Sequence, residues 1–368
     1  MSGGPPFRAE HIGSLLRPPE LLAKRRQFEA GEATAGELKA VEDRCIEAAV
    51  RLQERVGLDV VTDGEYRRLI YFGHFPAAVS GFTDMEAELE FTDERGRRMK
   101  YTTPVVTGKL RRLRGIATDE FAYVRSLTDR TPKVTLPSPC SQHFFRWREG
   151  VSERAYPRLD EFFADVAAVY RQELAALGEL GATYLQLDDV SLPMLCDAAA
   201  RERFRQRGND PSAILDAYIE IVNESVRDRP PGMVVGIHMC RGNNQGRWLG
   251  EGGYDFVAEQ VFDQLNVDVF FLEYDSPRAG SFAPLRYMPD DKRVVLGLVT
   301  TKRPELESAG DLKRRIEEAS AYVPVERLGI SPQCGFASTA PGNPVSPADQ
   351  EAKLRLVCQV AEEVWPAA

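Results

Sequence analysis

Apolar residues recur along much of the chain at the three- and four-residue spacing that places them on one face of a helix. The first clear stripe ends at Gly57, a predicted helix stop, and consists of Leu38, Val41, Cys45, Ala49, Leu52 and Val56. A second stripe ends near Gly181 and consists of Phe162, Val166, Val169, Tyr170, Leu174 and Leu177. Further helices are predicted at about 212–227 and about 347–364. The pattern therefore predicts several helices that each bury one face.

Short, continuous apolar runs separate these helices, as expected for the strands of a parallel sheet that is covered on both faces. Eight such strands are predicted, at about residues 9–13, 58–63, 133–137, 183–188, 233–238, 267–273, 293–299 and 328–332. Eight strand-and-helix units favour an α/β fold of the (β/α)8 TIM barrel type. A doubly wound sheet is the alternative, but it does not require eight units. We expect residues 1–368 to form a single catalytic barrel.

The interval between the second and third predicted strands is too long for one helix. Within it, Ala87–Phe91 and Met99–Thr102 have the composition of short strands, and Glu94–Arg97 has that of a turn. We interpret about 80–130 as a β-hairpin and helical segment inserted into the barrel after the second strand.

The composition limits the classes of partner. Hydrophobic residues make up 43% of the chain and charged residues 28%, which suits a large core and a soluble surface. A formal charge of −9 argues against nucleic acid and anionic membranes as partners. No apolar stretch approaches the roughly 18–20 residues of a membrane span, and the N-terminus lacks the apolar region of a signal peptide. With six scattered cysteines, the chain is expected to be cytoplasmic and to act on small molecules. The sequence does not predict its oligomeric state.

Polar residues follow most of the predicted strands, and in barrels of this type the C-terminal ends of the strands face the active site. In chain order these ends carry His11 and Ser14, Asp63 and Glu65, Ser138, Asp188 and Asp189, His238 to Arg241, Glu273 and Asp275, Thr300 to Lys302, and Cys334. Acids at such positions are unfavourable unless they are paired or used. Their presence on most strands therefore favours a functional site over coincidence.

Four of these residues form a ligand set suited to zinc: His238, Cys240, Glu273 and Cys334. The two thiolates and the imidazole argue against magnesium and calcium. A zinc ion with these ligands would have a net charge of about −1, which suits it to hold a thiol as a nucleophilic thiolate rather than to activate water. Each residue alone is more often part of a core, but four at three strand ends favour a metal site.

The other four cysteines are not predicted to be ligands. Cys45 and Cys358 lie within helix patterns and are expected in the core, while Cys140 and Cys196 lie in loops or at strand ends. A structural zinc in a binding module is the alternative from another functional class. Such sites use closely spaced ligands, whereas successive ligands here are 2, 33 and 61 residues apart.

Two acids and one turn predict how a substrate is held. Glu65 and Asp188, from different strands, can hold an ammonium group between them, while the turn Ile12–Gly13–Ser14 can bind a carboxylate through backbone N–H groups and a hydroxyl. Together they predict an α-amino acid whose thiol reaches the metal. The alternative for each acid is a salt bridge with a neighbouring arginine, such as Arg67 or Arg68 beside Glu65.

The chain resembles the catalytic barrel of the cobalamin-independent methionine synthase family, in a short single-barrel form whose fold is similar to that of uroporphyrinogen decarboxylase. The matching stretches occur in the family's order over nearly the whole chain: His11–Ser14 with Arg17–Pro18, Asp63–Glu65, Gln186–Asp189, His238–Cys240, Glu273 and Pro332–Gly335. The resemblance implies zinc on His238, Cys240, Glu273 and Cys334. It also implies homocysteine contacts from Ile12, Gly13, Ser14, Glu65 and Asp188, with methyl transfer from 5-methyltetrahydrofolate or a related donor giving methionine.

One departure from the family concerns the proton donor. The synthases carry a histidine, treated as this donor, after the seventh strand, whereas the corresponding stretch here contains Thr300, Thr301 and Lys302 and no histidine. Since an N5-methylated folate requires a proton on its leaving nitrogen, no catalytic residue is assigned. His74 and His143 are candidate replacements.

The methyl donor is therefore open. Candidate pterin contacts are Ser138, Cys140, His143 and Trp147. The competing reaction is the alkylation of another thiol, as in the epoxide-opening coenzyme M transferases of the same superfamily. The acid pair favours an amino-acid thiol over a sulfonate thiol, for which arginines would be expected.

Overall fold

A computed structural model describes residues 4–86, 90–144 and 146–366. Its main sheet contains six parallel strands in the order β12-β11-β10-β9-β8-β7. These strands are β7 (Val134–Pro137), β8 (Tyr184–Asp189), β9 (Val234–Met239), β10 (Val269–Glu273), β11 (Arg293–Val299) and β12 (Leu328–Pro332). Each lies within two residues of a predicted run, so the prediction of a parallel α/β sheet is confirmed.

The first two predicted strands are shorter than expected. Residues 9–13 make only an isolated parallel bridge, from Ala9 to Ile330 of β12. The run at 58–63 is reduced to β1 (Val60–Val61), which pairs in parallel with β6 (Thr131–Pro132) just before β7. Beyond β1 the backbone of Thr62 bonds to the side chain of Gln53, which donates to its carbonyl and accepts from its N–H. Side-chain hydrogen bonds have thus replaced the strand ladder.

These short segments still close the sheet into a barrel. The N–H of Glu10 donates to the carbonyl of Ile330 at 2.9 Å, and the N–H of Leu15 donates to that of Gly64 at 3.0 Å. The N–H of Lys133, between β6 and β7, donates to Val61 at 2.8 Å. The first segment therefore bridges β12 to the second, and the second reaches β7.

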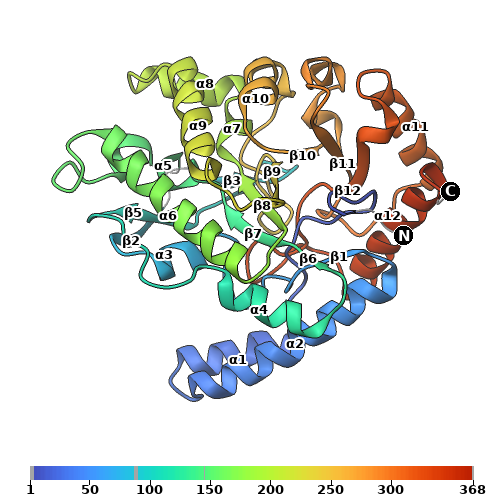
Figure 1. Cartoon of the computed structure of the whole chain (residues 1–368), viewed down its shortest axis with the longest axis horizontal. Helices are drawn as coiled ribbons and strands as arrows, with labels where there is room; N and C mark the ends of the chain where they lie inside the picture. The colour runs from blue at the N-terminus through green and yellow to red at the C-terminus, as the bar shows by residue number, and fades with distance from the viewer. Residues whose placement is uncertain (1–3, 87–89, 145, 367–368) are drawn as a thin grey trace.

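Helices surround the sheet (Figure 1). The long ones are α1 (Pro19–Glu29), α2 (Ala35–Val56), α4 (Thr118–Leu127), α6 (Leu159–Glu179), α8 (Ala198–Gln206), α9 (Pro211–Val226), α11 (Ala309–Ser320) and α12 (Pro347–Val364). The shorter ones are α3 (His74–Ala78), α5 (Ser141–Phe144), α7 (Ser191–Met194) and α10 (Ala258–Gln264), and 3-10 turns cover Trp147–Gly150, Tyr254–Phe256, Pro277–Ala279, Ala283–Tyr287 and Val325–Arg327. Helix α2 buries most of its predicted stripe and ends at Gly57 in the left-handed conformation, as predicted.

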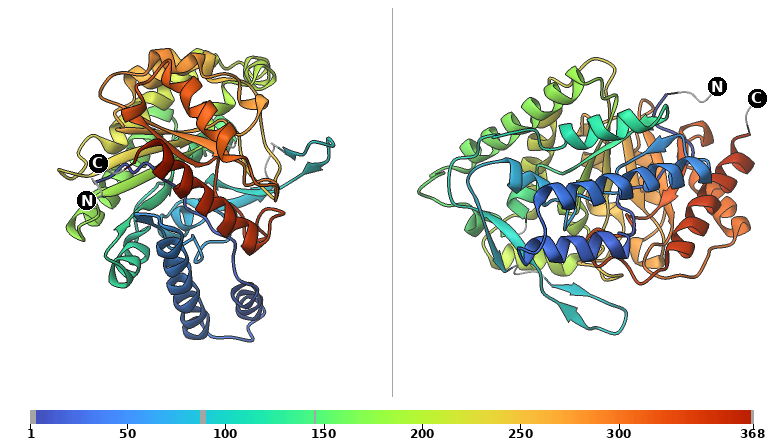
Figure 2. Two further views of the ribbon diagram at one scale, coloured as in Figure 1. Left: turned by 90° about the vertical axis from the view of Figure 1, so that its right-hand side faces the viewer. Right: turned by 90° about the horizontal axis from the view of Figure 1, so that it is seen from below.

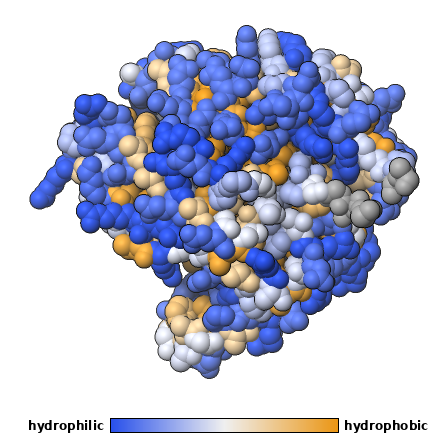
Figure 3. Space-filling model, viewed as in Figure 1, coloured by the Kyte–Doolittle hydropathy of each residue, from blue (hydrophilic) through white to orange (hydrophobic). Residues whose placement is uncertain are grey.

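The apolar faces of these helices are directed inward, which leaves a polar exterior. The face shown in Figure 3 is largely hydrophilic, and its hydrophobic residues are visible mostly in hollows among the polar ones. Within the part of the chain that the structure covers, no helix combines the length and the apolar character needed to cross a bilayer.

The segment after the second barrel strand forms an antiparallel ribbon. Strand β2 (Phe82–Glu86) pairs with β5 (Thr102–Val106), and β3 (Phe91–Thr92) pairs with β4 (Arg98–Met99). The predicted strand at 87–91 lies partly outside the described residues, which do not include 87–89. The turn end projects from the body (Figure 2), but Thr92 is bridged to Trp248 in the loop after β9. The ribbon therefore contacts the barrel near the C-terminal ends of the barrel strands.

Candidate metal and substrate site

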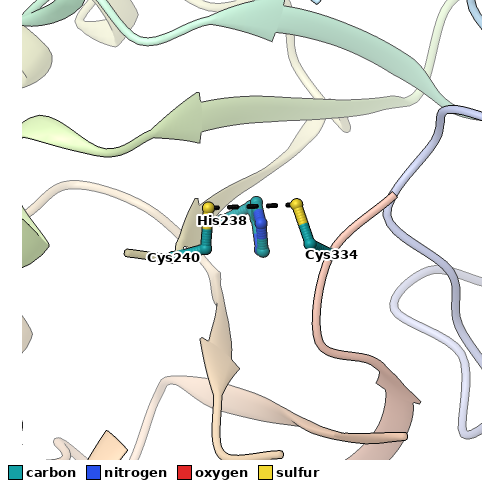
Figure 4. Close-up of side chains that lie close together, drawn as sticks. All are labelled: His238, Cys240 and Cys334. Atoms are coloured by element: carbon teal, nitrogen blue, oxygen red, sulfur yellow. Dashed lines mark hydrogen bonds between the residues drawn. The ribbon is translucent and has the colours of Figure 1, made fainter. Parts of the chain in front are cut away.

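His238, Cys240 and Cys334 converge at the C-terminal ends of β9 and β12. His238 lies within β9, Cys240 directly follows that strand, and Cys334 comes two residues after β12. One ligand atom from each lies within 4.8 Å of the others, and the two sulfur atoms are 3.9 Å apart. Figure 4 shows the sulfur atoms facing one another with the imidazole beside them. The structure thus brings together three of the four predicted ligands.

The chemistry of this cluster fits a zinc ion. All three side chains are buried, and neither ring nitrogen of His238 has a hydrogen-bond partner among the described residues. A buried polar group without a partner is unfavourable, which indicates that a ligand is needed there. The contact between the two sulfur atoms lowers the pKa of the Cys334 thiol well below its usual value, helped by the nearby His238, and raises the pKa of the Cys240 thiol well above its usual value. A low thiol pKa favours the thiolate that binds metal.

The fourth predicted ligand, Glu273, lies outside this three-residue group. It ends β10, and one carboxylate oxygen accepts from Arg278 at 2.7 Å and from Lys302 at 3.1 Å. The other oxygen accepts from the backbone N–H of Arg241 at 2.7 Å. Burial alone would raise the pKa of Glu273, but Lys302 and Arg278 hold it well below its usual value. In this structure Glu273 is therefore an ion-paired neighbour of the cluster.

A cavity opens beside the cluster. Four of the predicted substrate-binding residues line it, namely Ile12, Ser14, Glu65 and Asp188. The fifth, Gly13, lies between the first two in the same turn. Three of the four metal candidates and four of the five substrate candidates therefore lie around one cavity.

Glu65 and Asp188 line this cavity, and cationic side chains neutralise their carboxylates only in part. One oxygen of Glu65 accepts from Thr135 at 2.9 Å and lies 3.5 Å from Arg68, while the other is buried without a partner among the described residues. Asp188 accepts from Gln186 at 2.6 Å. Burial, reinforced by the charge of Glu65, raises the pKa of Asp188 to about 8. A cation between the two acids would relieve this repulsion.

The salt-bridge alternative accounts for these acids only in part. Arg68 is shared, because it also bonds to Glu120 at 2.5 Å. Arg67 is directed elsewhere, to Glu42 at 3.0 Å and to Asp43.

The turn that carries Ser14 is packed tightly against Glu65 and against the Cys334 loop. Gly13 has a φ of 135°, and a Cβ there would lie 2.8 Å from the Thr135 methyl group and 3.0 Å from Glu65 Oε1. A Cβ on Gly335 would lie 1.9 Å from Ser14 Oγ. Both approaches require glycine, because a larger residue would overlap its neighbour.

The substitution Gly13→Ala is expected to lower the free energy of unfolding by about 1–3 kcal/mol, since it adds a clash with Thr135 to a strained backbone. Gly232→Ala is the matched control, because Gly232 also has a positive φ, of 80°, but has nothing within 4 Å of the added Cβ. Urea denaturation of both variants measures the difference. Equal losses would show that the packing around Gly13 is unimportant.

The candidate replacement histidines do not line the cavity. His143 lies 3.1 Å from the hydroxyl of Tyr218 and packs against Phe163, and burial lowers its pKa to about 4. Burial also lowers the pKa of His74 well below its usual value. Trp147 packs against Phe204 and, like Ser138 and Cys140, is not among the residues that line the cavity. The structure does not bring these candidates to the site.

The stretch at the family's histidine position has structural contacts. Thr301 Oγ1 lies 3.0 Å from both Gln333 Oε1 and the carbonyl oxygen of Gly335, within hydrogen-bonding distance of each, which fixes the loop on both sides of Cys334. Lys302 bonds to Glu273 and to Asp275, the latter at 3.3 Å.

Sequence reasoning missed the aromatic part of the cavity. Tyr71 and Phe72 line it from the loop that precedes α3, and Phe91 and Tyr101 line it from the inserted ribbon. The ribbon pattern predicted strands but gave no signal for the direction of these rings. Asn243, three residues after Cys240, was also missed, and its amide donates to Thr301 and to the carbonyl of Gly335.

The chain is similar to several known proteins. The sequence profile of the family described as cobalamin-independent synthase, catalytic domain, matches residues 7–362. The chain is 40% identical over 366 residues to the uncharacterized protein YxjH of Bacillus subtilis, covering 98% of this chain and 95% of that one. It is 28% identical over 327 residues to the methionine synthase of Pyrococcus abyssi, covering 88% and 85%. A crystal structure of the putative vitamin-B12 independent methionine synthase from Listeria monocytogenes superposes with a TM-score of 0.74 at 32% identity, covering 98% and 99%.

Proposed function

Because the chain belongs to the cobalamin-independent methionine synthase catalytic-domain family, we propose that it is a zinc-dependent methyltransferase that methylates the thiol of homocysteine to give methionine. The donor would be 5-methyltetrahydrofolate or another methylated compound. The observation that carries the proposal is one shared cavity: the His238, Cys240 and Cys334 cluster opens into the same space as the carboxylates of Glu65 and Asp188.

We propose that these three residues hold the metal and that Glu273 is a fourth, exchangeable ligand. Catalytic zinc sites have three protein ligands and one open position, which agrees with a cluster of three and a glutamate held aside by Arg278 and Lys302. Zinc bound there would lower the pKa of the acceptor thiol and hold it as a thiolate.

The acceptor would be oriented by groups of the chain itself. Glu65 and Asp188 would bind its ammonium group, which supplies the positive charge that these two acids lack. The turn Ile12–Gly13–Ser14 would bind its carboxylate, and the tight contact between Ser14 and Gly335 fixes this turn beside Cys334. Burial around the acids keeps water away and strengthens both interactions.

The two alternatives are less well supported. A closed structural zinc does not require a cavity with unpartnered carboxylate oxygens beside it. Arginine side chains would be expected to bind the sulfonate of a thiol such as coenzyme M. The described residues that line the cavity include neither arginine nor lysine.

Removal of the metal tests the proposal directly. Purified protein is expected to contain about one zinc per chain, since one cluster of this kind is found in the described residues. Chelation should abolish methylation of homocysteine, and added zinc should restore it, as followed by mass spectrometry of methionine with a panel of donors. Undiminished activity in demonstrably metal-free protein would refute the assignment.

A further inference from the structure

Apart from the cluster itself, the cavity has a wall that is aromatic and acidic. Its described residues include four aromatic rings and three acids: Tyr71, Phe72, Phe91, Tyr101, Glu65, Asp188 and Asp189. The cationic side chains of lysine and arginine are absent from the described lining residues. A polyanionic ligand would therefore find no cationic side chain in this wall.

The rings are held firmly beside the metal-binding loops. Phe91 and Tyr101 meet edge to face with their centroids 4.9 Å apart, and a Cβ added to Gly242, two residues after Cys240, would lie 3.0 Å from the Phe91 ring. Tyr71 is fixed on the other loop, because its N–H donates to the carbonyl of Ser338 at 2.9 Å. The hydroxyl of Tyr71 is buried without a partner among the described residues.

The acids leave negative charge beside these rings. Asp189 is fully buried and lines the cavity; one of its oxygens accepts from the N–H of Leu192 at 2.7 Å, and the side chains of Ser138 and Cys140 also interact with this carboxylate. If Glu65 and Asp188 hold the ammonium of the acceptor, Asp189 remains to face a second ligand. Aromatic faces and a carboxylate together attract a methylated cation.

We propose, on the basis of the proposed function, that the methyl donor of this enzyme is a small onium compound, a methyl sulfonium or a quaternary methylammonium, bound against the aromatic wall of Tyr71, Phe91 and Tyr101. The donor class thereby follows from the aromatic and acidic residues that line the cavity.

The reaction with such a donor balances without a proton donor. The acceptor sulfur, as its thiolate, forms a bond to the methyl carbon, and the bond from this carbon to the positive sulfur or nitrogen breaks. The electron pair of that bond stays on the leaving atom, which departs as a neutral sulfide or amine. No proton is needed on the leaving group, in agreement with a described lining that contains no histidine except His238. A methylated folate would need one.

The basic side chains near the ribbon do not change this inference. They lie in an outer cleft lined in part by residues 93–97 and 245–248. Several are already neutralised, as in the pairs Arg97–Asp93 at 2.7 Å and Lys302–Asp275 at 3.3 Å. Because this outer cleft also contains basic side chains, the experiment below includes a folate with a polyanionic tail as one of the donors.

The test supplies the zinc-loaded full chain with homocysteine and one donor at a time: trimethylsulfonium, S-methylmethionine, glycine betaine or 5-methyltetrahydrofolate triglutamate. We expect methionine from at least one onium donor and none from the folate. Methionine from the folate alone would overturn the onium proposal and leave the proposed function intact. The onium proposal would also be overturned if every donor failed although homocysteine changed the visible spectrum of the cobalt-substituted protein. No spectral change would instead remove the proposed function.

A binding measurement gives a readout that does not depend on turnover. Calorimetry should detect tetramethylammonium but not its neutral isostere tert-butanol, and Phe91→Leu should weaken the cation about tenfold. Phe28→Leu is the matched control, because Phe28 is 41% exposed on α1 and outside the cavity. Equal binding of the cation and the neutral isostere would contradict a cation-selective wall.

Discussion

Replacing Cys240 or Cys334 with serine is expected to weaken zinc binding by at least about a hundredfold and to reduce homocysteine methylation to background. Loss even of a group that only supports a ligand weakens metal binding by about 10–100-fold, and a serine hydroxyl is a far poorer ligand than a thiolate. Each cysteine supplies one of only three converging donor atoms in the described cluster. Metal analysis and mass spectrometry of methionine measure the two effects.

The matched control is Cys45→Ser, because Cys45 is also buried but lies in α2, outside the cluster. This variant should keep one zinc per chain and its activity. Circular dichroism and thermal unfolding verify that each variant is folded. Stoichiometric zinc in folded Cys334→Ser would show that this thiol is not a ligand.

Asp188→Asn is expected to raise the KM for homocysteine about thirtyfold or more while leaving the zinc content unchanged. The loss of one partner in a buried charge pair costs about 2–5 kcal/mol, and 2 kcal/mol corresponds to about thirtyfold. The asparagine is isosteric and can still accept from Gln186, but it cannot neutralise an ammonium. Steady-state kinetics with homocysteine measure the change.

A substrate analogue isolates the ammonium contact. 4-Mercaptobutyrate lacks the amino group, so the wild type and Asp188→Asn should use it equally poorly. Asp197→Asn is the control, because Asp197 caps α8 through bonds to the N–H groups of Ala199 and Ala200 and lies outside the cavity. An unchanged KM for homocysteine in Asp188→Asn would remove the ammonium-binding role.

Hydrophobic periodicity was sufficient to predict the main sheet and several helices. Strands β11 and β12 and helix α12 have the predicted bounds, because continuous apolar runs and one-sided stripes report burial directly. The second strand could not be delimited this way, since hydrogen bonds from Gln53 to Thr62 end its ladder early. A side chain that replaces a neighbouring strand as hydrogen-bond partner of the backbone leaves no periodic pattern in the sequence.

The same distinction applies to the site. The strand-end rule predicted the convergence of His238, Cys240 and Cys334, because parallel strands fix where their ends lie. It could not predict the orientation of Glu273, which depends on Arg278, in the segment after its own strand, and on Lys302, in the loop after β11. The aromatic wall depends in turn on how the inserted ribbon docks, which no local pattern encodes.

The close contact between Ser14 and Gly335 has a thermodynamic consequence. Ser14 lies in the turn proposed to hold the acceptor, and its carbonyl accepts from the N–H of Phe336 at 2.9 Å. The two residues that it contacts, Gly335 and Phe336, belong to the loop that begins at Cys334. A loop ordered by the ion would therefore order the turn as well, so that metal loading and acceptor binding strengthen each other by the same factor. Metal-free chains would then leave the cellular amino-acid thiols largely unbound, and the supply of the ion would set how much enzyme competes for them.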